Sequence, residues 1–121
     1  MNFEKIERNG KEIAVVRSDD KVITDTQSAI DLLMTAKYDA GTKLLAVSKE
    51  LICDEFFILS SGVAGEILQK YINYEGKMAI YGDFSVYTSK PLHDFIYESN
   101  NGHDFFFVPT EEEAVNKLAE A

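Results

Sequence analysis

The residues whose types and spacing could do chemistry stand in one short stretch, where large apolar side chains give way to an amphipathic segment. Ser60 and Ser61 carry adjacent hydroxyl groups and are followed by Gly62 and Gly65; we call these four residues the serine–glycine turn. Glycine inside a helix costs roughly 1 kcal/mol relative to alanine, so both glycines need a reason. The structural interpretation is close helix-to-sheet packing, or a helix that begins only near Ser61. The functional interpretation is an exposed turn that presents its backbone and hydroxyl groups to a partner.

A second candidate site is the polar loop 83–90, which follows an apolar run typical of a buried strand. In parallel α/β sheets, ligands bind outside the carboxyl ends of the strands. Ser48 and Lys49 follow an earlier strand and could approach the same edge. The loop side chains that could line a small-ligand or peptide site are Asp83, Phe84, Tyr87 and Lys90. The alternative is an ordinary surface loop with two packed aromatic rings.

The remaining reactive side chains form no recognisable catalytic or metal-binding pattern. His93 and His103 are ten residues apart and lack the local spacing of a zinc motif. The carboxylate of Asp54 is expected to raise the pKa of the neighbouring Cys53 thiol, which makes a poor nucleophile. No nucleophile, base and orienting group stand in a legible arrangement. We therefore predict no catalytic residue, no metal and no cofactor.

The composition limits the kind of partner. The chain has 121 residues, a formal net charge of −9 and one cysteine. A field of this sign repels phosphate backbones and anionic lipid heads, so Gly62-x-x-Gly65 is not expected to be an RNA-binding GXXG loop. A single cysteine fits a reducing compartment, and no apolar run approaches the roughly 20 residues of a membrane span. We expect a cytoplasmic protein that binds neither nucleic acid nor membrane, of unspecified oligomeric state.

The first half of the chain predicts a hairpin, a helix and a buried strand. Asn9-Gly10 between two apolar-containing runs is a strong hairpin signal, because a type I′ turn needs positive φ at both central residues. The second run contains IAVV, which is apolar throughout and so predicts a strand covered on both faces. Thr24 and Gln27 have the spacing of a capping box before a helix. The predicted elements are strands 3–8 and 11–17, a helix over 25–40 and a strand over 44–48.

The second half predicts a long central helix followed by a repeated strand–helix pattern. Asp54 is the expected N-terminal acid of the central helix, and Gly76 its stop. Pro91 suits a helical first turn, and Thr110 with Glu113 forms another capping box. The predicted elements are a helix over 54–74, a strand over 77–82, a helix over 92–99, a strand over 104–108 and a helix through 119.

This order predicts a single α/β domain over residues 1–121. Alternating elements with short apolar strands indicate a mixed, mostly parallel sheet of about five strands. The N-terminal hairpin supplies its antiparallel part, and about four helices flank it.

The segments LLAVS and ILSSGVAGEIL, with GKMAIYG, FFFV and TEEEAVNKL downstream, resemble the STAS domains of anti-sigma factor antagonists. The resemblance spans roughly residues 13–118 and is sharp at Ser60-Ser61-Gly62. It implies a STAS-like fold and a phosphorylatable hydroxyl at Ser61, with a regulatory kinase as one partner class. Leu59 stands where that family has an acid. The wider pattern, with EFF, AGEILQKYINY and the SNNG turn, resembles a bacterial family of unknown function.

We therefore expect a non-enzymatic, STAS-like regulatory or protein-interaction domain that contacts its partner through the serine–glycine turn. The alternative is a small-ligand-binding or enzymatic α/β domain that uses loop 83–90. The two differ in what should be exposed, because the first needs an accessible Ser61 and the second needs a concave pocket with convergent polar groups.

Overall fold

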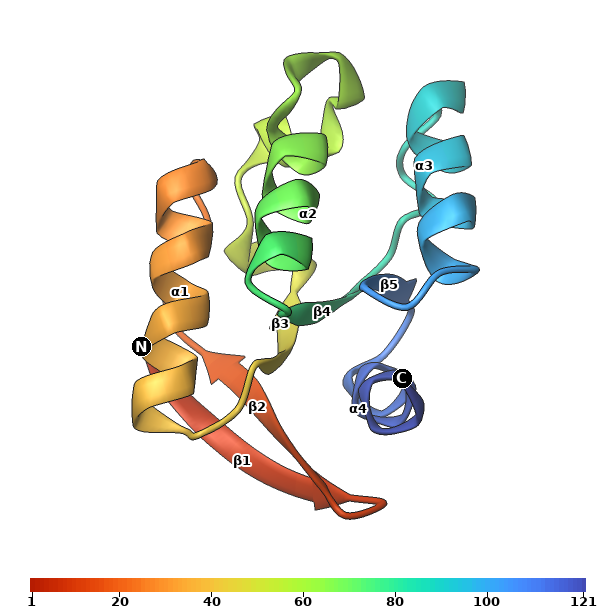
Figure 1. Ribbon diagram of the computed structural model, residues 1–121. Coiled ribbons are helices and arrows are strands. Elements are labelled where there is room, and N and C mark those ends of the chain that lie inside the picture. The colour runs from red at the N-terminus through yellow and green to blue at the C-terminus, as the bar shows by residue number, and fades with distance from the viewer.

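The computed structural model describes residues 1–121 and contains one five-stranded sheet with helices on both faces (Figure 1). The strands are β1 (Asn2–Arg8), β2 (Lys11–Arg17), β3 (Leu44–Ser48), β4 (Lys77–Tyr81) and β5 (Phe105–Val108). The helices are α1 (Thr26–Asp39), α2 (Val63–Asn73), α3 (Lys90–Asn100) and α4 (Glu111–Glu120). Three 3₁₀ turns connect β3 to α2, namely η1 (Lys49–Leu51), η2 (Asp54–Phe57) and η3 (Leu59–Ser61). The predicted α/β class, hairpin, mixed sheet and four helices are confirmed.

The strands lie in chain order across the sheet, from β1 at one edge to β5 at the other. β1 and β2 are antiparallel, and every pairing from β2 to β5 is parallel. Crossovers of one hand that always step in the same direction place their helices on one face. Accordingly α1, α2 and α3 stand side by side above the sheet, and α4 lies below it (Figure 1).

The hairpin forms at the predicted residues. Asn9 and Gly10 have φ values of 55° and 78°, and Arg8 pairs with Lys11. The IAVV segment of β2 is buried on both faces, as expected. Ala14 and Val16 belong to the larger core of 23 buried residues, between the sheet and α1 to α3. Ile13 and Val15 belong to the smaller core of 10 buried residues, between the sheet and α4.

The cap of α1 was predicted at the wrong residue. Asp25, not Thr24, is the N-cap: its carboxylate accepts a hydrogen bond from the Ser28 N–H at 2.7 Å. The Ser28 hydroxyl in turn accepts from the Asp25 N–H at 3.1 Å, so the reciprocal pair lies one residue later than the pair of Thr24 and Gln27. Aspartate accepts this bond as well as threonine does, and both residue types preceded the helix.

The central helix begins nine residues later than predicted, at Val63 and not at Asp54. Residues 54–61 form the turns η2 and η3, separated by Ile58 in an extended conformation with ψ of 96°. Gly62 then has φ of 81°, a left-handed value that an α-helix cannot contain. Phe56, Leu59 and Val63 have helical spacing in the sequence, but extended Ile58 and left-handed Gly62 place them in three different elements.

The stop at Gly76 was predicted for the wrong reason. Glu75 is the residue in the left-handed region, with φ of 60°, and the helix ends at Asn73. Gly76 is instead required by packing, since a Cβ atom there would lie 2.6 Å from a methyl carbon of the buried Leu33.

The C-terminal elements follow the sequence signals. Pro91 lies in the first turn of α3, and the Thr110 hydroxyl accepts from the Glu113 N–H at 3.2 Å to cap α4. The Asn100 side chain also donates to the Phe107 carbonyl at 3.1 Å and accepts from the Phe107 N–H at 2.7 Å. This amide pair satisfies the outer edge of β5, which would otherwise present unpaired backbone groups.

Candidate functional site

The serine–glycine turn lies on the surface at the N-terminal end of α2. Ser60, Ser61, Gly62 and Gly65 are all exposed. The Ser61 hydroxyl donates to the Glu55 carbonyl at 2.6 Å and accepts from the Val63 N–H at 3.2 Å. These bonds are to the backbone and leave the hydroxyl at the surface. The structure therefore brings the four predicted residues together at an accessible helix start.

Close packing does not explain either glycine of this turn. A Cβ atom added at Gly62 or at Gly65 would meet no atom within 4 Å. The packing interpretation was wrong, and the alternative of a helix that begins near Ser61 was right. Gly62 is explained by its positive φ, which strains any residue with a side chain. Gly65 lies in the first turn of α2 with open space around it and has no structural explanation.

An aromatic cluster beneath the turn fixes its position. Phe56 and Phe57 of η2 are buried, with ring centroids 5.0 Å apart. Phe56 also faces Phe107 of β5 at 6.4 Å, so the turn is anchored directly to the sheet. Buried aromatic side chains contribute large apolar areas and specific geometry. The segment before α2 is consequently held in place although it is neither helix nor strand.

The loop 83–90 contributes to this cluster and does not assemble the predicted ligand site. Tyr87 stacks on Phe57 at 5.1 Å, and Phe84 meets Phe107 edge-on at 5.5 Å. The Asp83 carboxylate accepts from the Ser85 hydroxyl, and Lys90 pairs with Asp94 at 2.7 Å on the surface of α3. Asp83 and Phe84 line a hollow of about 470 Å³, but Tyr87 and Lys90 do not. Asp83, Phe84, Tyr87 and Lys90 therefore do not line one common hollow.

Next to the serine–glycine turn the surface is hollowed and partly apolar. A depression of about 390 Å³ lies between η3 and the start of α3. Its lining residues are Phe57, Ile58, Leu59, Ser60, Ser89 and Pro91. Ile58 is 54% exposed and borders this depression.

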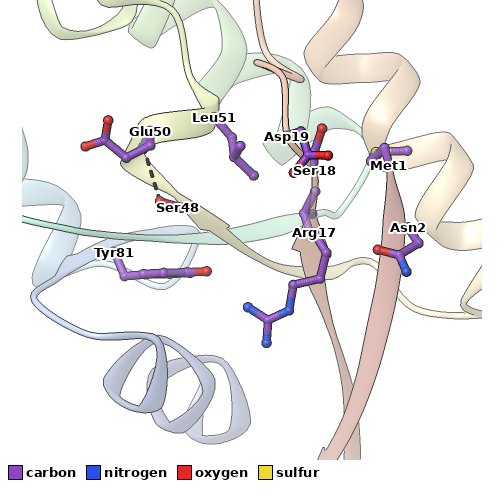
Figure 2. Close-up of a pocket in the computed structure, with 10 residues that line it drawn as sticks. Met1, Asn2, Arg17, Ser18, Asp19, Ser48, Glu50, Leu51 and Tyr81 are labelled. Carbon is purple, nitrogen blue, oxygen red and sulfur yellow. Dashed lines mark hydrogen bonds between the residues drawn. The ribbon is translucent and has the colours of Figure 1, made fainter.

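Of the residues that line the largest hollow, the sequence analysis named Ser48 alone. This hollow has a volume of about 530 Å³ and lies at the carboxyl ends of β2, β3 and β4, where Arg17, Ser48 and Tyr81 end their strands (Figure 2). Arg17 and Tyr81 are, like Ser48, the last residues of their strands, and the strand-end rule could have singled them out as well. Figure 2 shows the Arg17 side chain directed toward α4 and the Glu50 side chain directed away from Arg17, so these polar side chains do not converge on one point.

The guanidinium group of Arg17 forms ion pairs with two carboxylates of the protein itself. It donates to Glu111 of α4 through both terminal nitrogens, with Nη2 3.0 Å from Oε2, and to Glu4 of β1 at 3.1 Å. The Glu111 hydrogen bond raises the pKa of Arg17 and lowers the pKa of Glu111. Burial, followed by the charge of Glu111, raises the pKa of Tyr81, whose hydroxyl donates to Glu111 at 3.3 Å. The cluster joins the hairpin to α4 and offers no free cation to an anionic ligand.

This cluster gives stability a defined pH dependence. The carboxyl pKa of Glu111 is depressed below its ordinary value of 4.5, so the ion pair stabilises the fold above that pH and is lost as pH falls through the folded-state pKa. Glu111→Gln should lower stability at pH 7 by about 0.5–1 kcal/mol, the range of a well-aligned surface pair. The difference from wild type should shrink below pH 4.5 in thermal melts. Glu120→Gln, an exposed position outside the ion pairs, is the control; a difference independent of pH would contradict this account.

The histidines and the cysteine lie apart. His93 Nε2 is 2.6 Å from the Tyr87 carbonyl, whereas His103 lies beyond the far end of α3. No group of three or more His, Cys, Asp or Glu side chains is placed to hold a metal ion. Cys53 is buried, and burial raises the pKa of its thiol. None of the helices has the length and apolar composition that crossing a bilayer requires.

Comparisons with known proteins locate this chain in a family without an assigned activity. Curated proteins gave no match. Among solved structures, the chain is similar to the crystal structure of a "putative anti-sigma factor antagonist" from Thermotoga maritima. It is 14% identical, with a TM-score of 0.45 over 96% of this chain and 93% of that chain. Residues 8–118 match the family described as a domain of unknown function, DUF4180, and the protein therefore belongs to that family.

Proposed function

We propose that this protein acts by binding a protein partner, without catalysis, and that the serine–glycine turn is the centre of the contact. The observation that carries the proposal is Gly65. It is exposed, it lies in the first turn of α2, where alanine is the better helix former, and no atom of the protein needs the space. A partner that approaches the helix backbone closely would need it.

The surroundings of Gly65 suit a protein contact better than a small-molecule site. Ile58 offers an exposed aliphatic side chain beside Ser60, and the depression next to them is open. The aromatic cluster beneath holds this surface in one conformation. A preorganised contact surface spends less free energy on ordering when it binds.

The polar groups here favour binding over chemistry. The Ser61 hydroxyl bonds only to backbone atoms, and no histidine or carboxylate is bonded to it to act as a base. The loop 83–90, the other predicted site, has its two aromatic rings packed into the fold.

Ser61 is the position at which we propose that the contact is regulated. A phosphate there would add about two negative charges to the contact surface. It would lie at the N-terminal end of α2, where the helix dipole favours negative charge. It would also replace the hydroxyl that now donates to the Glu55 backbone carbonyl. A kinase is thus one partner class, as the sequence resemblance implied.

Quantitative capture from a lysate of the source cell tests the proposal. Immobilised wild type, Ser61→Asp and Tyr38→Asp are compared by mass spectrometry, after melting curves have shown that all three are folded. Tyr38 is exposed on α1 and controls for the added charge. We expect at least one protein to be retained by wild type and Tyr38→Asp and lost by Ser61→Asp. Identical sets on all three surfaces would refute the proposal.

A further inference from the structure

The outer side of β1 is an open edge of the sheet (Figure 1). β1 pairs with β2 on one side and with no strand on the other. Outside this hairpin ladder, no hydrogen bond reaches the backbone of residues 2–8. The opposite edge, on β5, is covered by the amide group of Asn100. A strand of seven residues with an open edge is a template on which another strand can pair.

The hairpin turn determines which backbone groups of β1 face the open edge. The two-residue turn at Asn9-Gly10 makes Arg8 and Lys11 the closing hydrogen-bonded pair. In an antiparallel ladder hydrogen-bonded and non-hydrogen-bonded pairs alternate, so every second residue counted back from Arg8 bonds to β2. The backbone N–H and C=O groups of the residues in between point to the open edge, and these residues are Phe3, Lys5 and Glu7.

We infer that the open edge of β1 binds β1 of a second copy of this chain, antiparallel, with the two Ile6 residues opposite each other. In a two-fold dimer residue i of one copy meets residue j of the other, and j meets i. With Ile6 on the axis, Lys5 lies opposite Glu7 of the second copy, and Glu4 lies opposite Arg8. Lys5 and Glu7 have outward backbone groups, so both of their pairings close with hydrogen bonds. Ile6, half-buried against the core under α4, gains an apolar neighbour.

The charges on β1 select this register among its neighbours. An axis on Lys5 would place two ammonium groups opposite each other, and an axis on Glu4 or Glu7 would place two carboxylates opposite each other. Like charges directly opposite are destabilising in a sheet. Only the axis on Ile6 gives all four charged residues of β1 a partner of opposite sign. Because β1 carries two acids and two bases, the net charge of −9 lies on the rest of the chain.

Within one copy, the carboxylate of Glu7 has no cation. Glu7 lies directly opposite Glu12 in the hairpin and forms no ion pair, while Lys5 lies 4.0 Å from Glu12. Lys5 of the second copy would supply the cation that Glu7 lacks. Glu4 and Arg8 already form ion pairs within the chain, so the two pairs of Lys5 with Glu7 contribute most of the charge complementarity.

The inference goes beyond the proposed function and does not depend on it. β1 contacts β2 and α4, whereas the serine–glycine turn lies before α2 and packs on η2. The dimer therefore presents two serine–glycine turns, neither of which is used for dimerisation. Two linked contact surfaces strengthen the binding of a partner that is itself multivalent, when the geometry allows both contacts at once.

Sedimentation velocity over a dilution series tests the inference on the full-length protein. Lys5→Glu and Glu7→Lys each place like charges opposite each other in both symmetric pairings. Lys70→Glu makes the same change in net charge as Lys5→Glu, on the exposed side of α2, and is the control. We expect wild type and Lys70→Glu to dimerise equally, and each β1 variant to dimerise about tenfold or more weakly.

An equimolar mixture of Lys5→Glu and Glu7→Lys should dimerise again, because the carboxylates of one chain then lie opposite the lysines of the other. This recovery also shows that neither variant fails merely by unfolding. The inference is overturned if wild type remains monomeric throughout the dilution series, if the two single variants dimerise like wild type, or if their mixture does not recover.

Cross-linking tests the register itself. In a non-hydrogen-bonded pair the Cα atoms lie about 4.5 Å apart, within the range of a disulfide. With oxidised glutathione, Ile6→Cys should therefore give a covalent dimer on non-reducing electrophoresis. Lys5→Cys is the matched control, because its two copies would lie diagonally across the interface, and the natural Cys53 is buried. Cross-linking of Lys5→Cys without cross-linking of Ile6→Cys would overturn the register.

Discussion

Phe56→Ala is expected to lower the free energy of unfolding by about 3–5 kcal/mol, the usual cost of removing a buried phenylalanine. Phe56 is fully buried in η2 and meets both Phe57 and Phe107. The substitution leaves a cavity between the segment before α2 and the sheet. Because Phe56 is the residue of η2 that contacts the sheet at Phe107, the serine–glycine turn should also lose its fixed position.

Urea unfolding monitored by circular dichroism gives the measurement. Ile58→Ala is the matched control: it removes an aliphatic side chain two residues away, but one that is 54% exposed. We expect this control to change stability by less than about 0.5 kcal/mol, as surface substitutions do. Equal losses for the two variants would mean that η2 does not anchor the turn as described.

Alanine at the two glycines of the turn should act in opposite directions. Gly62→Ala should cost about 1–2 kcal/mol, because φ of 81° is left-handed and disfavoured for a residue with Cβ. Gly65→Ala should instead raise stability, by at most the roughly 0.5–1 kcal/mol of a helix-interior position, because it replaces glycine in the first turn of α2 without meeting any atom. The same urea titrations measure both. Destabilisation by Gly65→Ala would show a structural need for that glycine and remove the main support for a partner contact.

The strands were predictable because each is a short apolar run bounded by turn residues. LLAVS became β3 at the predicted bounds, and IAVV was correctly assigned to a strand covered on both faces. The start of α2 was not predictable from periodicity, because Phe56, Leu59 and Val63 have helical spacing although Ile58 and Gly62 interrupt the helix between them. Gly62 was the signal in the sequence for a break before the helix, because glycine readily adopts the left-handed φ of 81° that it has here.

The candidate site residues also differ in whether their surroundings depend on neighbours in the sequence or on distant residues. The four residues of the serine–glycine turn are local in sequence, and the structure brings them together on the surface. Whether Phe84 and Tyr87 face a ligand or the core depended on Phe57 and Phe107, which are distant in sequence. Apart from Ser48, the residues of the hollow at the strand ends were missed for a similar reason. Arg17 and Glu111 are 94 positions apart in the sequence, and no local pattern indicates that they form an ion pair with each other.

Amide hydrogen exchange of the protein, free and bound to the partner retained in the capture experiment, tests the central claim most directly. Exchange reports the opening of individual backbone segments, so it locates the contact without a substitution. We predict slower exchange on binding in residues 58–66, with no change in the hairpin β1–β2. Protection confined to residues near Arg17 and Tyr81, at the largest hollow, with residues 58–66 unchanged, would contradict the account.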